Sequence, residues 1–133
     1  MIFYSESLHG ITPSKLRGFH ADWASPPSSE KLFRMMRGSH SVVLAIDEKS
    51  DKVVGYAAAL SDGHLFAFVS SIEVLPAFRG KGIGTELMRR MLARYSTMYG
   101  VDLLCDEALR PFYEKFQMKA LTGMALRRYD SAA

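Results

Sequence analysis

Three glycines at alternate positions, Gly80, Gly82 and Gly84, mark the point at which the pattern of apolar residues changes its period. Before them the chain alternates as strands do, and after them apolar residues recur at helical spacing. Glycine adopts backbone conformations that other residues avoid, so this spacing predicts a sharp turn between a strand over 65–75 and a helix from Ile83. The chain must therefore fold as strands and helices packed together.

The segment before this turn predicts an antiparallel meander of three strands. The expected strands cover 41–46, 52–60 and 65–75, and polar turns over 47–51 and 61–63 separate them. Strands joined by turns this short lie side by side in one sheet.

Two helices are expected before the meander. Pro13 suits the first turn of a helix that runs to Trp23, with Thr12 as its N-cap. The prolines that follow end this helix, and Ser28 or Ser29 caps a second short helix.

The helix after the glycine turn has the strongest period, from Ile83 to Met98, and Gly100 is expected to close it. Its methionines, Met88, Met91 and Met98, are expected in the core. The remaining expected elements are a strand over 2–8, a strand over 101–105 buried on both faces, a helix over 111–116 and a strand or hairpin over 119–129. The resulting order β-α-α-β-β-β-α-β-α-β predicts an α/β fold with one mixed sheet, in a single domain over 1–133.

Length and charge narrow the class of protein further. The chain has 133 residues, 48% of them apolar, which is typical of one globular domain. Its 17 basic and 14 acidic residues leave a net charge of +3, and the basic residues are scattered, so no nucleic-acid partner is expected. The densest basic run, Arg79 to Lys81, lies among the glycines and favours a small anionic ligand.

The sequence has no pattern typical of a metal site, a disulfide, a signal peptide or a membrane helix. Cys105 is the one cysteine, and the four histidines have no metal-ligand spacing, so we expect no metal and place Cys105 in a buried strand. The chain has no signal-peptide pattern and no apolar run long enough for a membrane helix, so a cytoplasmic location and no membrane partner are expected.

The glycine turn can bind an anion. Successive backbone N–H groups and the positive end of the following helix dipole favour a phosphate or pyrophosphate there. The spacing is neither a Walker A loop, which ends in Gly-Lys-Ser/Thr, nor the dinucleotide pattern GxGxxG. The alternative is a glycine-rich turn that binds no ligand.

Two motifs resemble one family. The run Val74–Gly84 is similar to the acetyl-CoA-binding motif of the GCN5-related N-acetyltransferase (GNAT) superfamily, whose core (Gln/Arg)-x-x-Gly-x-(Gly/Ala) falls here on Arg79, Gly82 and Gly84. The run Pro111–Met118 resembles the family's Phe-Tyr-Glu-Lys-x-Gly-Phe. With the element order, the resemblance covers nearly the whole chain and is typical of small single-domain bacterial members.

The resemblance implies an acetyl-CoA-dependent N-acetyltransferase that acts by direct attack of an amine in a ternary complex. The backbone of 72–74 would pair with the pantetheine arm, the Val74 N–H would meet the acetyl carbonyl, and 79–85 would hold the pyrophosphate. Tyr113 matches the tyrosine that protonates the leaving CoA thiolate; a phenol with its usual pKa of about 10 is protonated at neutral pH. The implied cofactor-binding residues are Ile72, Glu73, Val74, Arg79, Gly80, Lys81, Gly82, Ile83, Gly84, Thr85 and Asp106.

The chain departs from the family pattern after Tyr113. Gln117 stands where the family usually has glycine, and Met118 where it has phenylalanine. A glutamine can adopt the left-handed conformation at modest cost, so we expect a local change and not loss of the site.

The base that takes the amine proton is unassigned. Counting back by twos from Val74, one face of the strand carries no base, and Glu73 faces the other way unless a bulge intervenes. That face holds Ile72, Ser70 and Phe68. Glu73, a water chain, and a carboxylate such as Asp22 or Glu30 remain open alternatives.

The acceptor amine is unidentified, and a homodimer is left open. Specificity is expected from the turn over 23–29, the first two helices and the turn over 62–64. Trp23 either walls a substrate pocket or plugs the packing between helices, and the plug is the favoured interpretation. A non-catalytic acyl-CoA sensor on the same fold is the alternative function.

Overall fold

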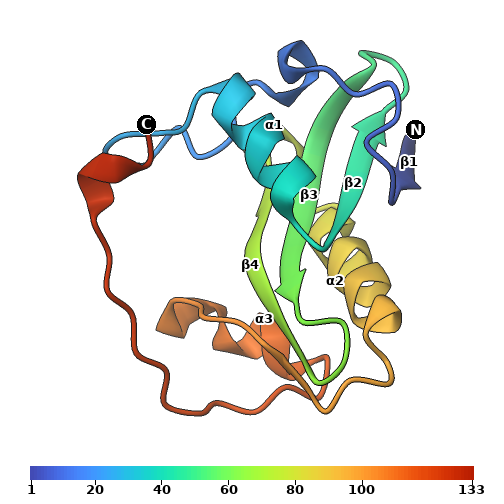
Figure 1. Cartoon of the computed structure of the whole chain (residues 1–133). Helices are drawn as coiled ribbons and strands as arrows, with labels where there is room; N and C mark the ends of the chain where they lie inside the picture. The colour runs from blue at the N-terminus through green and yellow to red at the C-terminus, as the bar shows by residue number, and fades with distance from the viewer.

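The computed structural model describes all 133 residues and contains one mixed sheet of five strands, with helices on both faces (Figure 1). The strands follow the order β1-β2-β3-β4-β5 across the sheet. The first four run antiparallel to their neighbours, and β5 runs parallel to β4. The strands are β1 (Ile2–Ser5), β2 (Ser41–Asp47), β3 (Lys52–Ser61), β4 (Phe66–Val74) and β5 (Gly100–Asp102). This confirms the mixed α/β fold and the meander predicted from the sequence.

Each face of the sheet has its own apolar cluster. Helix α2 (Ile83–Arg94) covers one face, where alternate strand residues such as Val43 are fully buried. Helix α1 (Ser29–Gly38) and a short 3-10 turn, Pro13–Leu16, cover the other face, where Leu44 is fully buried. The central strands are therefore apolar on both faces, and the core forms without a disulfide or a bound metal.

The sequence signals at α1 and at the third helix were accurate. The Ser28 hydroxyl accepts the backbone N–H of Lys31 at 3.1 Å, so Ser28 is the N-cap of α1. Helix α3 (Arg110–Glu114) lies within two residues of its predicted range. None of the helices has the length and apolar character that crossing a lipid bilayer requires.

Helix α2 is shorter than its apolar period indicates. It ends at Arg94, and Tyr95 leaves the helical conformation with φ −113° and ψ 25°. The buried Tyr95 hydroxyl bonds to His40 and Ser41, which holds this residue against the sheet. Gly100 therefore begins β5 instead of closing the helix. Of the predicted methionine stripe, Met88 and Met91 are fully buried in the core, and the partly buried Met98 packs against the same cluster.

The first predicted helix, from Thr12 to Trp23, is wrong beyond a single 3-10 turn. The Thr12 hydroxyl bonds to the Ser14 hydroxyl and caps no backbone N–H. Gly18 has φ +96° and His20 has φ +59°, so the chain turns twice where a helix would continue. These turns bury Leu16 and Phe19 against the sheet and bring His20 over it.

The predictions after α2 were also partly wrong. Strand β5 pairs with β4 only as far as Asp102, so the chain leaves the sheet there and Cys105 is exposed, not buried. The range 119–129 forms no strand, because its backbone has no ladder partner. Figure 1 shows this red segment as a coil that runs from α3 toward α1. Its apolar side chains are exposed: Leu121, Met124 and Leu126.

Candidate active site

The end of β4 has a free edge. Strand β5 pairs with β4 only from Phe66 to Phe68, whereas β4 continues to Val74. Strand β3 occupies the opposite edge of β4 along this whole length. The backbone from Val69 to Val74 is therefore open on the side of β5 and can hydrogen-bond to an extended ligand as an added strand would. This stretch includes the predicted positions Ile72, Glu73 and Val74.

The glycine turn begins where this free edge ends. Gly80 and Gly82 have φ of +78° and +84°, and no atom lies within 4 Å of the position that a Cβ would take at either residue. Gly82 is the N-cap of α2 and offers no side-chain cap, and the first bond of the helix is that from the Glu86 N–H to the Gly82 carbonyl. The N–H groups of 83–85 thus have no partner within the helix. The predicted glycine turn is confirmed as a backbone feature.

Arg79 is held at the end of β4. Its Nε donates to the Val74 carbonyl at 2.9 Å, and its Nη2 lies 3.4 Å from Glu73 Oε1. Its backbone N–H donates to the Pro76 carbonyl at 3.3 Å. The guanidinium therefore fixes the turn to the strand, whereas the nearby Lys81 lies over the ring of Phe78 at 5.3 Å.

Helix α3 lies close to the glycine turn through Phe112. A Cβ at Gly84 would lie 3.6 Å from the Phe112 ring and 3.9 Å from Val74 Cγ2, so the end of β4, the start of α2 and α3 converge. Tyr113 is 8% exposed and packs in the cluster under α2. Burial, with a smaller contribution from Cys105, raises the pKa of the Tyr113 phenol above its ordinary value. It is therefore protonated at neutral pH.

The departure at Gln117 changes little. Gln117 has φ +68°, the conformation that a glycine there would take, and its N–H donates to the Glu114 carbonyl at 3.1 Å. Gln117 thus takes the left-handed conformation that the sequence analysis allowed for it. Asp106 is exposed and precedes the 3-10 turn Glu107–Leu109 without capping it through its side chain.

A bulge in β4 changes which side chains share a face. Ala58 pairs with Ser71 and Ala59 with Val69, so Ser70 is the extra residue. Counting by twos from Val74 fails at this point. Val69, Ile72 and Val74 pack against the cluster under α2, whereas Ser71 and Glu73 lie on the opposite face with Tyr56.

Glu73 meets His20 on that face. Its Oε2 accepts the backbone N–H of His20 at 2.7 Å and lies 2.9 Å from His20 Nδ1. His20 Nε2 lies 2.5 Å from the Tyr56 hydroxyl, which lies 2.6 Å from Ser71 Oγ. No local pattern in the sequence indicates this network, because its members come from three separate segments of the chain. Asp22 and Glu30, the other carboxylates considered, are exposed and outside it.

Burial shapes the acidity of this network. Burial alone would raise the pKa of the Glu73 carboxyl, but the contacts with His20, aided by Arg79, bring that pKa below its ordinary value. Burial also raises the pKa of the Tyr56 phenol far above its ordinary value. Glu73 is therefore a carboxylate and Tyr56 a neutral phenol at neutral pH.

The network borders a pocket of about 290 Å³. Trp23 forms one wall: it is 46% exposed and its ring lies 4.1 Å from the His20 ring, centroid to centroid. The favoured interpretation of Trp23 as a packing plug is therefore wrong. Besides Trp23, the lining residues are His20, Pro27, Lys31, Leu32, Met35, Tyr56, Ser70, Ser71, Arg127 and Ala132.

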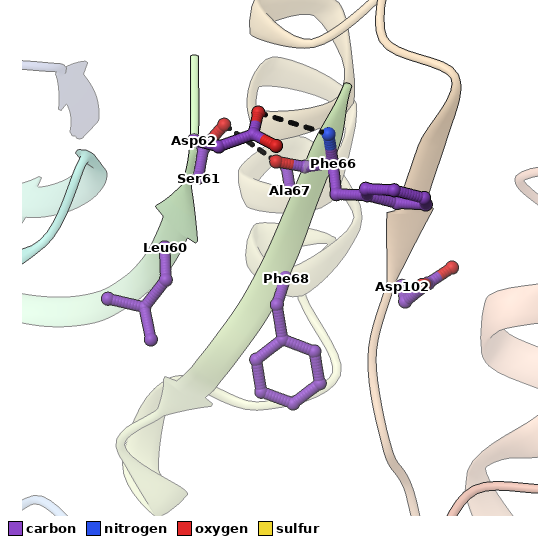
Figure 2. A pocket seen from close by; sticks show the side chains of 7 residues that line it. All are labelled: Leu60, Ser61, Asp62, Phe66, Ala67, Phe68 and Asp102. Carbon is purple, nitrogen blue, oxygen red and sulfur yellow. Dashed lines mark hydrogen bonds between the residues drawn. The ribbon is translucent and has the colours of Figure 1, made fainter. Parts of the chain in front are cut away.

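A second pocket, of about 500 Å³, lies at the hairpin between β3 and β4 (Figure 2). Figure 2 shows the Asp62 carboxylate bonded to the backbone N–H of Phe66, and the Phe66 ring extending toward the strand that carries Asp102. That carboxylate also accepts the N–H groups of His64 and Leu65, which lower its pKa and fix the turn. The pocket lies where β4 and β5 are paired, away from the free edge of β4.

Comparisons with known proteins agree with this architecture. A family model, the acetyltransferase (GNAT) family, matches residues 8–118. A candidate acetyltransferase from Deinococcus radiodurans R1 has a TM-score of 0.94 and 41% identity, over 98% of this chain and 91% of that chain. A GNAT family acetyltransferase from Streptococcus pneumoniae TIGR4 has a TM-score of 0.77 and 27% identity, over 96% and 98%.

More distant structures share the fold. Glucosamine-6-phosphate N-acetyltransferase from Arabidopsis thaliana has a TM-score of 0.72 at 17% identity, over 98% of this chain and 99% of that chain. No curated protein sequence matches the chain. Because the family model covers most of the residues and the Deinococcus protein is 41% identical along nearly the whole chain, this protein belongs to the acetyltransferase (GNAT) family.

Proposed function

We propose that this protein transfers an acetyl group from acetyl-CoA to a primary amine, by direct attack of the amine in a ternary complex. The observation that carries the proposal is the free edge of β4, which leads into a glycine turn and the uncapped N-terminus of α2. The edge suits an extended pantetheine arm, and the turn suits the pyrophosphate at its end. Family membership supports acyl transfer.

The cofactor residues follow from these two features. The N–H groups of 80–85 cradle the pyrophosphate, and Arg79 keeps the turn fixed to Val74. The backbone of 72–74 pairs with the pantetheine arm, and the Val74 N–H donates to the acetyl carbonyl. A donor placed at a developing oxyanion contributes about 3–4 kcal/mol where water is excluded. Asp106 lies in the chain between β5 and α3 and borders the cofactor.

Tyr113 is the general acid in this proposal. The tetrahedral intermediate collapses, the C–S bond breaks, and the phenol O–H gives its proton to the CoA thiolate. The raised pKa of the phenol keeps that proton available, since a free thiol has a pKa of about 8.5. Conversion to phenylalanine keeps the ring in the core and removes the proton donor.

The acceptor occupies the pocket beside Trp23. Its charged lining side chains are Lys31 and Arg127, and no carboxylate lines it. Lys31 Nζ donates to the Ser131 and Ala133 carbonyls, at 3.3 and 2.7 Å, so Arg127 is the cation left for a ligand. The charge favours an amine that also carries a carboxylate or phosphate group.

The test is a panel of amines in which release of free CoA is measured. The panel contains simple amines, amino acids, phosphorylated amines, and peptides with lysine or a free N-terminus. Turnover with one class supports transfer, and the proposal expects the anionic amines to react best. A rise in melting temperature with acetyl-CoA, combined with background hydrolysis for every amine, would favour a non-catalytic sensor.

A further inference from the structure

Four side chains form a continuous polar path that borders the acceptor pocket and ends at Glu73, outside the pocket lining. Ser71, Tyr56 and His20 line the pocket, and Ser71 Oγ lies 2.6 Å from the Tyr56 hydroxyl oxygen. The path continues from the Tyr56 hydroxyl to His20 Nε2 over 2.5 Å, and from His20 Nδ1 to Glu73 Oε2 over 2.9 Å. The elements that supply these groups are β3, β4 and the loop before α1.

The path is buried and held in place. The His20 side chain is 5% exposed and that of Glu73 is 15% exposed, so both are largely removed from solvent. His20 takes a left-handed backbone conformation, φ +59°, which a non-glycine residue adopts only when its surroundings hold it there. Two contacts keep His20 in this conformation: its own N–H donates to Glu73, and its ring packs against the ring of Trp23.

The protonation of the His20 ring determines which group donates in each hydrogen bond of the path. The polar neighbour of His20 Nδ1 is the Glu73 carboxylate, although their geometry is too bent for a well-formed hydrogen bond. Because a carboxylate oxygen can only accept, we assign the proton of the neutral imidazole to Nδ1. Nε2 then accepts the Tyr56 O–H, and the Tyr56 oxygen accepts the Ser71 O–H. The lone pairs of Ser71 Oγ are left for the pocket.

We propose that Ser71, Tyr56 and His20 form a relay that removes the proton of the attacking amine, with Glu73 as a positioning residue. The inference rests on the proposed function. As the amine nitrogen forms its bond to the acetyl carbon, its N–H bond breaks and the proton goes to Ser71 Oγ. Ser71 gives its proton to Tyr56, and Tyr56 gives its own to His20 Nε2. His20 ends as an imidazolium beside the Glu73 carboxylate.

The charges around His20 are consistent with this end state. Glu73 faces Nδ1, and Arg79 is the cation on the far side of that carboxylate. Tyr56 and Ser71 are neutral at the other side of the ring. Lys31 and Arg127 also belong to the pocket lining, and neither is hydrogen-bonded to His20. Glu73 is thus the group that favours a positive charge on His20.

The first experiment measures kcat with the best amine for two hydroxyl deletions, Tyr56→Phe and Ser71→Ala. General base catalysis contributes about 10²- to 10⁴-fold, so we expect each to lower kcat by about 10²-fold while the acetyl-CoA thermal shift is kept. Tyr99→Phe, on a tyrosine that is 82% exposed, is the control and keeps the wild-type kcat. Wild-type kcat in Tyr56→Phe would overturn the relay.

The pH profile of kcat distinguishes a positioning role of Glu73 from a purely structural one. The relay needs neutral His20, so kcat falls on the acid side, and Glu73→Gln shifts that fall to lower pH because the imidazolium loses its carboxylate. The amine's own titration is common to both enzymes. A Glu73→Gln enzyme with an unshifted profile would contradict the role of Glu73.

Fluorescence of Trp23, the single tryptophan, tests the same coupling without turnover. Its ring stacks on His20, and an imidazolium quenches indole emission, so a pH titration reports the charge of His20. We expect His20→Gln to abolish the transition and Glu73→Gln to lower its midpoint; equal midpoints would overturn the coupling. Absence of turnover with every amine refutes the proposed function and the relay together, whereas turnover that survives Tyr56→Phe refutes the relay alone.

Discussion

The backbone N–H of His20 donates to Glu73 Oε2 at 2.7 Å and joins two residues that are 53 positions apart in the chain. This bond ties the loop before α1 to the end of β4, where the free edge of the strand begins to turn toward α2. Glu73 therefore links the two proposed substrate sites: it lies on the free stretch of β4 and contacts His20, which lines the pocket beside Trp23.

Glu73 should stabilise the fold in a pH-dependent way. Its pKa is lower in the folded protein than in the unfolded chain, so its contribution is fully present above the ordinary carboxyl pKa and is lost as the pH falls through the lowered value. Glu73→Gln is expected to lower the free energy of unfolding by about 1–3 kcal/mol at pH 7, and by less at pH 3. Urea titrations at both values measure the difference. Glu48→Gln, in an exposed turn, is the control, and a pH-independent gap would contradict the prediction.

Gly82 should be needed for its backbone conformation. With φ +84° and open space around it, an alanine meets no neighbour there but pays about 1–2 kcal/mol for the left-handed backbone. We expect Gly82→Ala to lower stability by that amount and to reduce the thermal shift produced by acetyl-CoA. Gly38→Ala, at the end of α1 with equally open space and no left-handed φ, should do neither. Equal behaviour of the two variants would refute the role of the turn.

Tyr113→Phe should separate cofactor binding from catalysis. The ring stays in the cluster under α2, so the acetyl-CoA thermal shift and the KM for acetyl-CoA should change little. The loss of the proton donor should lower kcat by about 10²-fold or more. Steady-state kinetics with Tyr129→Phe as the exposed control provide the comparison. Full turnover of Tyr113→Phe would remove the general-acid assignment.

Gly55 should allow α2 to approach the sheet closely, because it has no side chain. A Cβ at this position would lie 3.1 Å from Ile83 Cγ2 and 3.3 Å from Leu87 Cδ1. Gly55→Val is expected to destabilise the protein by about 1–3 kcal/mol and, because Ile83 begins α2, to weaken acetyl-CoA binding. Calorimetric titration and thermal unfolding measure the two effects. If Gly55→Val behaved like Gly38→Val, the close packing would have no consequence for the turn.

Local signals in the sequence were sufficient for the meander, α1, the glycine turn and α3. The period of the apolar residues changes within a few positions at Gly82, and Ser28 caps α1 by a contact three residues away. The motif around Tyr113 is contiguous as well. Elements of this kind depend on neighbours in the chain, so a single sequence contains the information.

The structural features that the sequence did not predict depend on contacts between residues far apart in the chain. The cap signal at Thr12 was overridden by the turns at Gly18 and His20, which serve burial of Phe19 and the bond to Glu73. The bulge at Ser70 depends on the pairing of β3 with β4; it leaves the alternation from Ser71 to Val74 intact and shifts the faces only of the residues before it. The segment 119–129 pairs with no strand, although the sheet keeps a free edge along β4. The network around Glu73 depends on a contact across 53 positions of the chain, so it has no local signal in the sequence.

The most direct test of the proposed function is to measure both products of the reaction in one sample. The protein is incubated with isotopically labelled acetyl-CoA and the best amine of the panel; free thiol is titrated, and the labelled amide is quantified by mass spectrometry. We expect one labelled amide for each CoA released, at a rate that falls by about 10²-fold in Tyr113→Phe. Release of CoA without labelled amide, or no release above the buffer rate with any amine, would contradict the proposed acetyl transfer.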